Sequence, residues 1–66
     1  MTLELFGRLL KMLHLLTNHG PLSIDDLAMR LDISRRMAYR YISGFQELGF
    51  EVIKRGSRYG ISPMSP

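Results

Sequence analysis

The absence of cysteine is the feature that most constrains what this short chain can fold into. With 66 residues, the chain lies near the lower limit at which one hydrophobic core supports a fold without cross-links. Disulfides, thiolate metal sites and a cysteine nucleophile are all excluded. Stability must therefore come from apolar packing, for which a hydrophobic content of 45% is sufficient. We expect one small domain in a reducing, cytoplasmic setting.

Apolar periodicity predicts a first helix over residues 3–18. The expected core stripe of this helix consists of Phe6, Leu9, Leu13 and Leu16. The apolar arc is nevertheless wider than a three-helix core needs. Its margins carry Leu3 and Leu10 on one side and Leu5 and Met12 on the other, with Leu15 isolated among polar neighbours. Either the hairpin and the chain ends cover these residues, or they form a homodimer seam through the first helix.

Turn and capping residues divide the next segment into two further helices. Gly20, able to take the left-handed conformation, and Pro21 end the first helix. Ser23 is the expected N-cap of a short second helix, and Ser34 that of a third helix. The core stripe expected for the second helix is Ile24, Leu27, Ala28 and Leu31. A tight turn at Asp32 and Ile33 separates the two, and the third helix runs to about Leu48, before Gly49.

After Gly49 the apolar period changes to that of strands. Val52 and Ile53 precede the turn residues RGS, and Tyr59 and Ile61 follow them, which predicts a β-hairpin. The fold class is α+β, mainly α, with a three-helix core and a C-terminal hairpin. We assign residues 1–62 to this domain and residues 63–66 to a tail or the start of a linker.

The third helix has two dissimilar faces. At 100° per residue its core side carries Ala38, Tyr41, Ile42, Phe45 and Leu48. The opposite side, here named the outer ridge, consists of Arg36, Tyr39, Arg40 and Ser43, with Arg35 and Met37 on its flanks. The ridge has no acid over its first turns and lacks the oppositely charged pairs of a merely solvated helix face.

The charge distribution points to a polyanionic partner. Residues 1–33 carry three Lys or Arg against four Asp or Glu, a net charge of −1, whereas residues 34–66 carry six against two, a net charge of +4. A short helix, a tight turn and a longer basic helix form the helix-turn-helix arrangement, whose second helix enters the DNA major groove. In the groove, Arg36 and Arg40 can each donate two hydrogen bonds to guanine O6 and N7, or equally bind a phosphate. Lys54, Arg55 and Arg58 make the hairpin tip a second cationic element.

Four stretches together resemble the winged helix-turn-helix domains of bacterial transcriptional regulators. They are RLLKMLHLL, GPLSIDDLAMRLDISRRMAYRYI, ELGFEVIKR and RYGIS, spanning about residues 8–62. The similarity is greatest to the deoxyribonucleoside-operon-repressor-like group and to the N-terminal domain of the biotin ligase/repressor. It implies sequence-specific binding of duplex DNA by a transcriptional regulator or its DNA-binding module. The third helix would lie in the major groove and the hairpin, as the wing, on the flanking backbone.

The resemblance also implies which residues face DNA. In the recognition helix they are Ser34, Arg35, Arg36, Met37, Tyr39, Arg40 and Ser43. In the wing they are Lys54, Arg55, Ser57 and Arg58. At the start of the second helix, Ser23 would contact the DNA backbone. Family members commonly have RRT and then YRDI where this chain has RRMAYRYI. Met37 therefore replaces a threonine that could bond a phosphate, and Tyr41 replaces an acid. The replacement at Tyr41 reflects either altered packing or a different mode of DNA binding.

Other function classes find little support. His14 and His19 have no nearby carboxylate, and the adjacent Asp25 and Asp26 diverge on a helix, so we expect no metal, no cofactor and no catalytic pair. The chain has little room for a pocket beside its core, so neither an enzyme nor a small-molecule site is expected. Glu4, Arg8 and Lys11 interrupt the apolar N-terminal segment and exclude a membrane span. The alternative that remains is a winged helix for protein-protein interaction or dimerisation without DNA binding.

Overall fold

The computed structural model describes residues 3–62, which form three helices and a three-stranded antiparallel sheet. The elements in chain order are α1 (Leu3–Asn18), β1 (Leu22–Ser23), α2 (Ile24–Leu31), α3 (Arg35–Glu47), β2 (Val52–Arg55) and β3 (Arg58–Ile61). The predicted α+β, mainly α class with a C-terminal hairpin is confirmed. The tail predicted for residues 63–66 lies outside the described residues.

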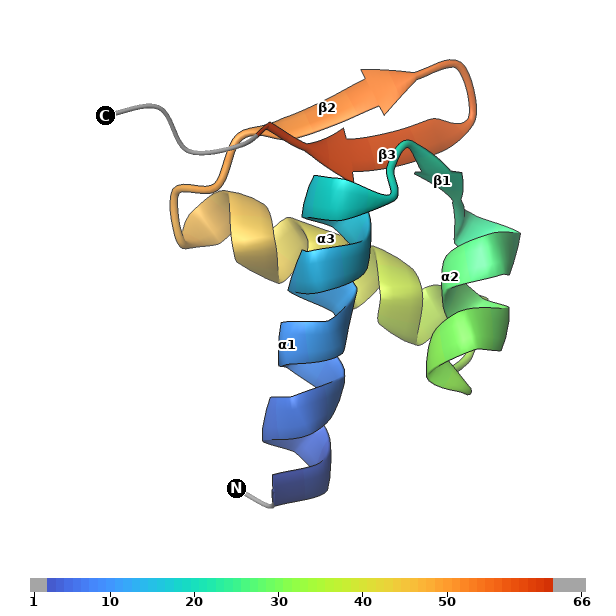
Figure 1. The fold of residues 1–66 in the computed structure, drawn as a ribbon, viewed down its shortest axis with the longest axis vertical. Helices are drawn as coiled ribbons and strands as arrows, with labels where there is room; N and C mark the ends of the chain where they lie inside the picture. Colours follow the sequence, from blue (N-terminus) through green and yellow to red (C-terminus); the bar gives the residue numbers. More distant parts are fainter. Residues whose placement is uncertain (1–2, 63–66) are drawn as a thin grey trace.

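The helices cross one another, and the sheet lies at one end of the domain (Figure 1). In this view α1 stands upright in front of α3, and α2 lies beside them. The hairpin of β2 and β3 closes the upper end, next to the C-terminal turns of α1. The first turns of α1 extend away from the hairpin, beyond the other elements.

Two serine caps begin the helices of the helix-turn-helix unit. The Oγ of Ser23 accepts a hydrogen bond from the backbone N–H of Asp26 at 3.1 Å. The Oγ of Ser34 likewise accepts one from the N–H of Met37 at 3.1 Å. Each cap satisfies a backbone donor that the first helical turn leaves unpaired, so both predicted helix starts are confirmed.

The turn between α2 and α3 depends on Asp32, which adopts the left-handed conformation with φ of 54°. The following N–H, that of Ile33, donates to the carbonyl of Ala28 at 3.0 Å. Asp is one of the few residues other than glycine that tolerates this conformation. The predicted tight turn is therefore present, and it brings α3 across α2 within three residues, 32–34.

The strand β1 was not predicted from the sequence. It pairs antiparallel with β3, with Leu22 opposite Tyr59 and Ser23 opposite Arg58, so β3 lies between β1 and β2. A segment of two residues is too short to show the alternating pattern of a strand, so only its pairing with β3 defines β1 as a strand. The wing is thereby attached to the start of α2.

The conformation of Gly20 differs from the one that the sequence predicted. Among residues 3–62 the glycines with positive φ are Gly49 and Gly56, so Gly20 does not take the left-handed conformation. A Cβ on Gly20 would lie 2.6 Å from the carbonyl oxygen of Leu16 and 3.1 Å from the Cα of Gly60. Glycine is needed here because the end of α1 approaches β3 closely.

The core faces of α1 and α3 differ in part from the predicted stripes. The buried apolar residues are Met12, Leu15, Leu16, Leu22, Ile24, Leu27, Leu31, Ala38, Ile42, Phe45 and Ile61. The predicted stripe on α1 was wrong for Phe6, which is 50% exposed, while Met12 and Leu15, expected at the margin or alone, are buried. The apolar arc of α1 is wide enough that periodicity did not identify its core side.

Leu48 was also placed wrongly in the core, because it is 77% exposed. The helix ends at Glu47, and Phe50 turns back to cover the core instead. The rings of Phe45 and Phe50 meet edge to face with centroids 5.6 Å apart. Ala28 of α2 is only half-buried, whereas the rest of the predicted α2 stripe is buried.

Candidate nucleic-acid interface

The outer ridge lies on the solvent side of α3. Arg36, Tyr39, Arg40 and Ser43 are all exposed and line an open hollow of about 620 Å³. Ala38, Ile42 and Phe45 on the opposite side are buried, and they fix the rotation of α3 against α1 and α2. The predicted ridge therefore exists as a continuous surface, while its contact with DNA stays a prediction.

The two arginines of the outer ridge have their charges available. Within residues 3–62, neither Arg36 nor Arg40 forms an ion pair. Glu47 lines the same hollow at its far end, two helical turns beyond Arg40 and hence about 10 Å along the axis. Both guanidiniums can therefore bind an anion without first breaking an internal interaction.

Arg35 differs from its neighbours because an acid of α2 holds it. Its Nε lies 3.2 Å from Oδ1 of Asp25, and the two side chains are 66% and 76% exposed. An ion pair this exposed contributes about 0–1 kcal/mol. Sequence reasoning missed this pair, since the two residues belong to different helices. Arg35 thus reaches the predicted interface with part of its charge neutralised.

The predicted serine contacts and Met37 occupy the first turns of α2 and α3. The oxygens of Ser23 and Ser34 already accept the capping hydrogen bonds, but each hydroxyl proton remains able to donate to a phosphate. Ser34 is exposed and Ser23 is half-buried. Met37 is half-buried at the edge of the ridge. A helix N-terminus favours an anion electrostatically, which suits both serines to a phosphate.

The wing carries its cations at the turn. Lys54, Arg55, Ser57 and Arg58 are all exposed, and Gly56 turns the chain with φ of 60°. Arg55 of β2 lies directly opposite Arg58 of β3 in the ladder. Like charges at opposite positions destabilise a hairpin, and a bound anion would relieve the repulsion.

An aromatic contact joins the wing to the outer ridge. Tyr39 of α3 and Tyr59 of β3 meet with ring centroids 6.3 Å apart and an interplanar angle of 88°. Lys54 Nζ lies 5.7 Å from the centroid of the Tyr59 ring, a cation–π distance. Sequence reasoning treated Tyr59 only as a hairpin residue. An aromatic residue within a cationic hairpin was the available signal.

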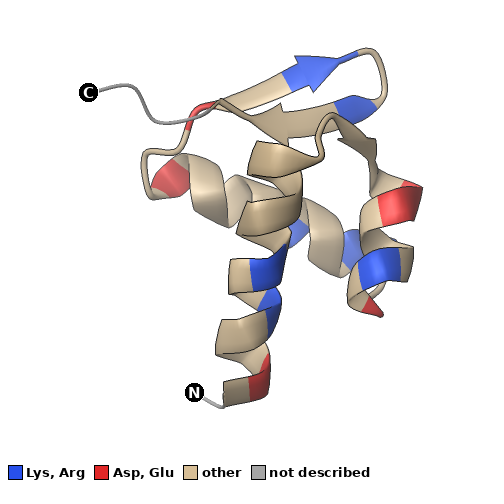
Figure 2. Ribbon diagram, in the orientation of Figure 1, with Lys and Arg blue, Asp and Glu red and all other residues tan. Residues whose placement is uncertain are grey.

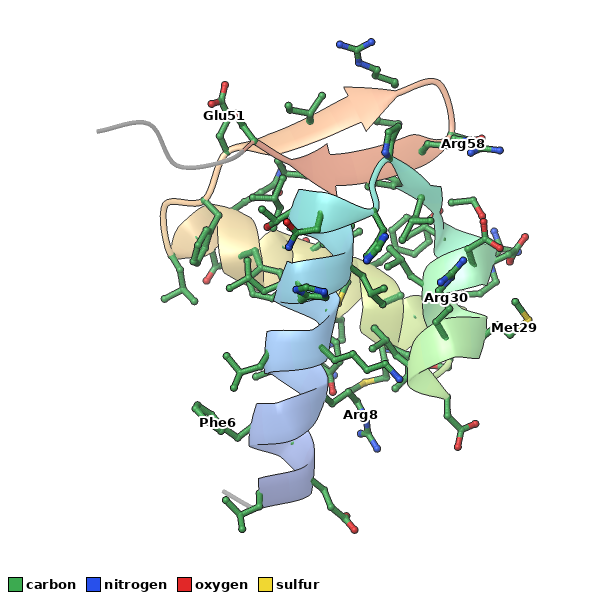
Figure 3. All side chains as sticks on the ribbon, in the orientation of Figure 1. Phe6, Arg8, Met29, Arg30, Glu51 and Arg58 are labelled. Carbon is green, nitrogen blue, oxygen red and sulfur yellow. The ribbon has the colours of Figure 1, made fainter. Side chains whose placement is uncertain are left out.

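Charge is distributed unevenly over the domain. Figure 2 shows Lys and Arg at the turn end of the hairpin and on the N-terminal half of α3, and acidic positions at the C-terminal end of α3 and before β2. Glu51 and Arg58 accordingly lie at opposite ends of the hairpin (Figure 3). The cationic ends of α3 and of the wing therefore define one candidate interface.

The described residues offer neither a cluster of metal ligands nor a membrane-spanning helix. No group of three His, Cys, Asp or Glu among residues 3–62 is placed to hold a metal ion. The rings of His14 and His19 instead contact each other edge to face at 5.5 Å. No helix in this part is long and apolar enough to cross a membrane.

The chain is similar to a known protein family. A family model described as an HTH domain matches residues 8–62, which include the whole ridge and wing. No curated protein and no solved structure matches the chain significantly.

Proposed function

Because the chain belongs to the HTH domain family, in the winged form found in deoxyribonucleoside-operon-repressor-like regulators and at the N-terminus of the biotin ligase/repressor, we propose that it binds duplex DNA sequence-specifically. It acts as a transcriptional regulator or as the DNA-binding module of one. In this proposal α3 enters the major groove, and the wing contacts the flanking backbone.

The observation that carries the proposal is the cationic and aromatic surface of α3, which the Tyr39–Tyr59 contact joins to the wing. Arg36 and Arg40 stand one helical turn apart on its exposed side. Arginine can donate two hydrogen bonds to guanine O6 and N7, a contact that discriminates between bases by about 1–3 kcal/mol. The Tyr39–Tyr59 contact holds the wing beside this helix, so both elements can engage one duplex.

The remaining predicted contacts surround these arginines. Ser34, Arg35 and Met37 flank the start of the ridge, and Ser43 extends it by one turn. We assign Ser23 and Ser57 to phosphate contacts because hydroxyl groups donate readily to phosphate oxygens. The wing cations Lys54, Arg55 and Arg58 bind the backbone or the adjacent minor groove.

Binding should depend steeply on salt. Arg36, Arg40, Lys54, Arg55 and Arg58 could together neutralise about five phosphates. Release of the corresponding counterions gives a slope of log K against log salt concentration of about −4.5. Fluorescence anisotropy of a labelled mixed-sequence duplex, titrated with the chain over a salt series, measures this slope.

A matched pair of variants tests the surface specifically. Arg40→Ala removes an exposed cation from the outer ridge, and Arg30→Ala removes one from the exposed side of α2. We expect Arg40→Ala, and likewise Arg36→Ala, to weaken binding to a selected site about tenfold or more, and Arg30→Ala to change it about twofold at most. Equal losses from Arg40→Ala and Arg30→Ala would mean that only net charge matters.

The same titration distinguishes the alternative function. Negligible binding of any duplex at low salt would overturn the proposal and favour a winged helix for protein-protein interaction without DNA. Selection of bound sequences from a random DNA pool identifies the operator and shows whether its half-sites are symmetric. The expectation that the chain is not an enzyme stays a prediction. Self-association through α1 is a separate proposal, since apolar residues of that helix carry it.

A further inference from the structure

The helix α1 carries a second apolar stripe, of which only Leu13 packs against the core. Leu3, Phe6, Leu10 and Leu13, here named the α1 seam, recur with the alternating three- and four-residue spacing of a coiled-coil seam. Leu3 is 87% exposed, Phe6 50% and Leu10 51%, while Leu13 is half-buried. Figure 3 shows Phe6 pointing away from the rest of the domain.

An apolar hollow adjoins the α1 seam. It has a volume of about 260 Å³ and lies between α1 and α3. Its lining consists of Leu5, Leu9, Arg40, Tyr41, Gly44, Phe45 and Leu48. An apolar cavity of about 150 Å³ already accommodates benzene, so an aromatic side chain fits here. Leu48 on the rim is among the most exposed large apolar residues, which adds to the uncovered surface.

We propose that two copies of this chain pair through their α1 helices. The helices run antiparallel about a two-fold axis, with Leu3 facing Leu13 of the second copy and Phe6 facing Leu10. Phe6 of each copy then reaches the rim of the hollow on the other. Seam and hollow lie on the same surface, as a two-fold interface between identical chains requires.

The charges of α1 favour this partner over nucleic acid. Glu4, Arg8 and Lys11 all fall on the half of the helix opposite the centre of the α1 seam. The seam therefore offers no cation to a phosphate, and an antiparallel pair brings no like charges together. Every seam position meets an apolar residue of the second copy.

The exposed apolar area and the projecting first turns of α1 determine how strongly the two copies pair. Leu3, Phe6, Leu10 and Leu48 together expose roughly 500 Å², so two copies bury on the order of 1,000 Å², the lower end for a specific interface. The first turns of α1 extend beyond the other elements (Figure 1), and short helical segments are marginal without a packing partner. A weak, concentration-dependent dimer follows.

Sedimentation velocity on the free chain, without DNA, tests the proposal from about 1 μM to about 500 μM. The sedimentation coefficient should rise from that of a monomer toward that of a dimer as the concentration increases. Phe6→Glu should abolish the rise. Met29→Glu is the matched control, because Met29 is a 72% exposed apolar residue of α2 outside the seam. A monomer over the whole range, or equal effects of the two variants, overturns the pairing.

A cross-linking experiment remains decisive even if Phe6→Glu fails to fold. The chain has no cysteine, so only introduced thiols can react. A Cβ added at Gly7 would meet no other atom within 4 Å, and Gly7 lies near the proposed two-fold axis. Under mild oxidation Gly7→Cys should form a covalent dimer much faster than Ser57→Cys at the wing. Equal rates would contradict the interface. Neither experiment contains DNA, so either can fail without affecting the proposed function.

Discussion

Tyr39 on α3 and Tyr59 on β3 pack edge to face, 6.3 Å between ring centroids, although they are 20 residues apart in the sequence. Tyr59 also packs on the core, whereas Tyr39 is 45% exposed. The pair therefore anchors the proposed DNA-facing surface to the hydrophobic interior and sets the position of the wing relative to α3.

This contact should be measurable as a coupling free energy. A double-mutant cycle on the free energy of unfolding, with Tyr39→Ala, Tyr59→Ala and the double variant, should give about 0.5–1.5 kcal/mol. Tyr39→Phe keeps the ring and serves as the control, with little change in stability. Strictly additive alanine effects would mean that the two rings contribute independently.

Asp25→Asn should strengthen DNA binding. The substitution releases Arg35 from its 3.2 Å ion pair and removes a negative charge beside the proposed interface. We expect a several-fold gain in affinity at low salt, with a loss of at most about 1 kcal/mol in stability because the pair is exposed. Anisotropy titration and thermal melting measure the two effects.

Asp26→Asn is the control for Asp25→Asn, since it removes the same charge from the same helical turn without touching Arg35. Asp25→Asn should also lose most of its advantage when Arg35 is already alanine. The same gain from both asparagine variants would assign the effect to net charge and not to Arg35.

Substitutions of Ser34 should affect the stability of the fold and the affinity for DNA in opposite orders. Ser34→Ala removes the cap on the Met37 N–H and should cost about 1 kcal/mol, or a melting temperature lower by about 4–8 °C. Ser34→Asp keeps a capping oxygen and should be nearly as stable as the original. Its negative charge faces the phosphates, however, and should weaken DNA binding more than alanine does. If the original chain and the two variants ranked in the same order for stability and for DNA affinity, Ser34 would not belong to the interface.

Ala38→Arg should unfold the domain. Ala38 is fully buried at 0% exposure, so the substitution places an unpaired charge and a long side chain in the core. The penalty is comparable with the whole stability of a chain this size, on the order of 3–10 kcal/mol. Circular dichroism measures the loss of helix, and Gln46→Arg at an exposed position of the same helix is the control. A folded Ala38→Arg variant would contradict the rotation of α3.

Local signals determined the elements that were predicted correctly. Ser23 and Ser34 are caps whose partners lie three residues ahead, and α1 ends at Asn18 as the following glycine and proline indicated. The outer ridge was also predictable, since the buried side of α3 contains Ala38, Ile42 and Phe45 at helical spacing.

What could not be predicted depends on contacts between distant segments. Apolar residues surround so much of α1 that only its packing shows Met12 to be inside and Phe6 outside. Leu48 is uncovered because the chain turns at Gly49 and brings in Phe50. β1 and the pair of Asp25 with Arg35 exist only because the fold brings separate elements together.

Ser23 belongs to two structures at once, because it caps α2 and pairs with Arg58 in the sheet. The wing of this domain is therefore not a module that can be exchanged by itself. A chimera that grafts a foreign hairpin after Gly49 must also carry a residue pair at positions 22 and 23 that matches the new strand. Without that match, the graft would leave the first turn of α2 without its attachment to the sheet.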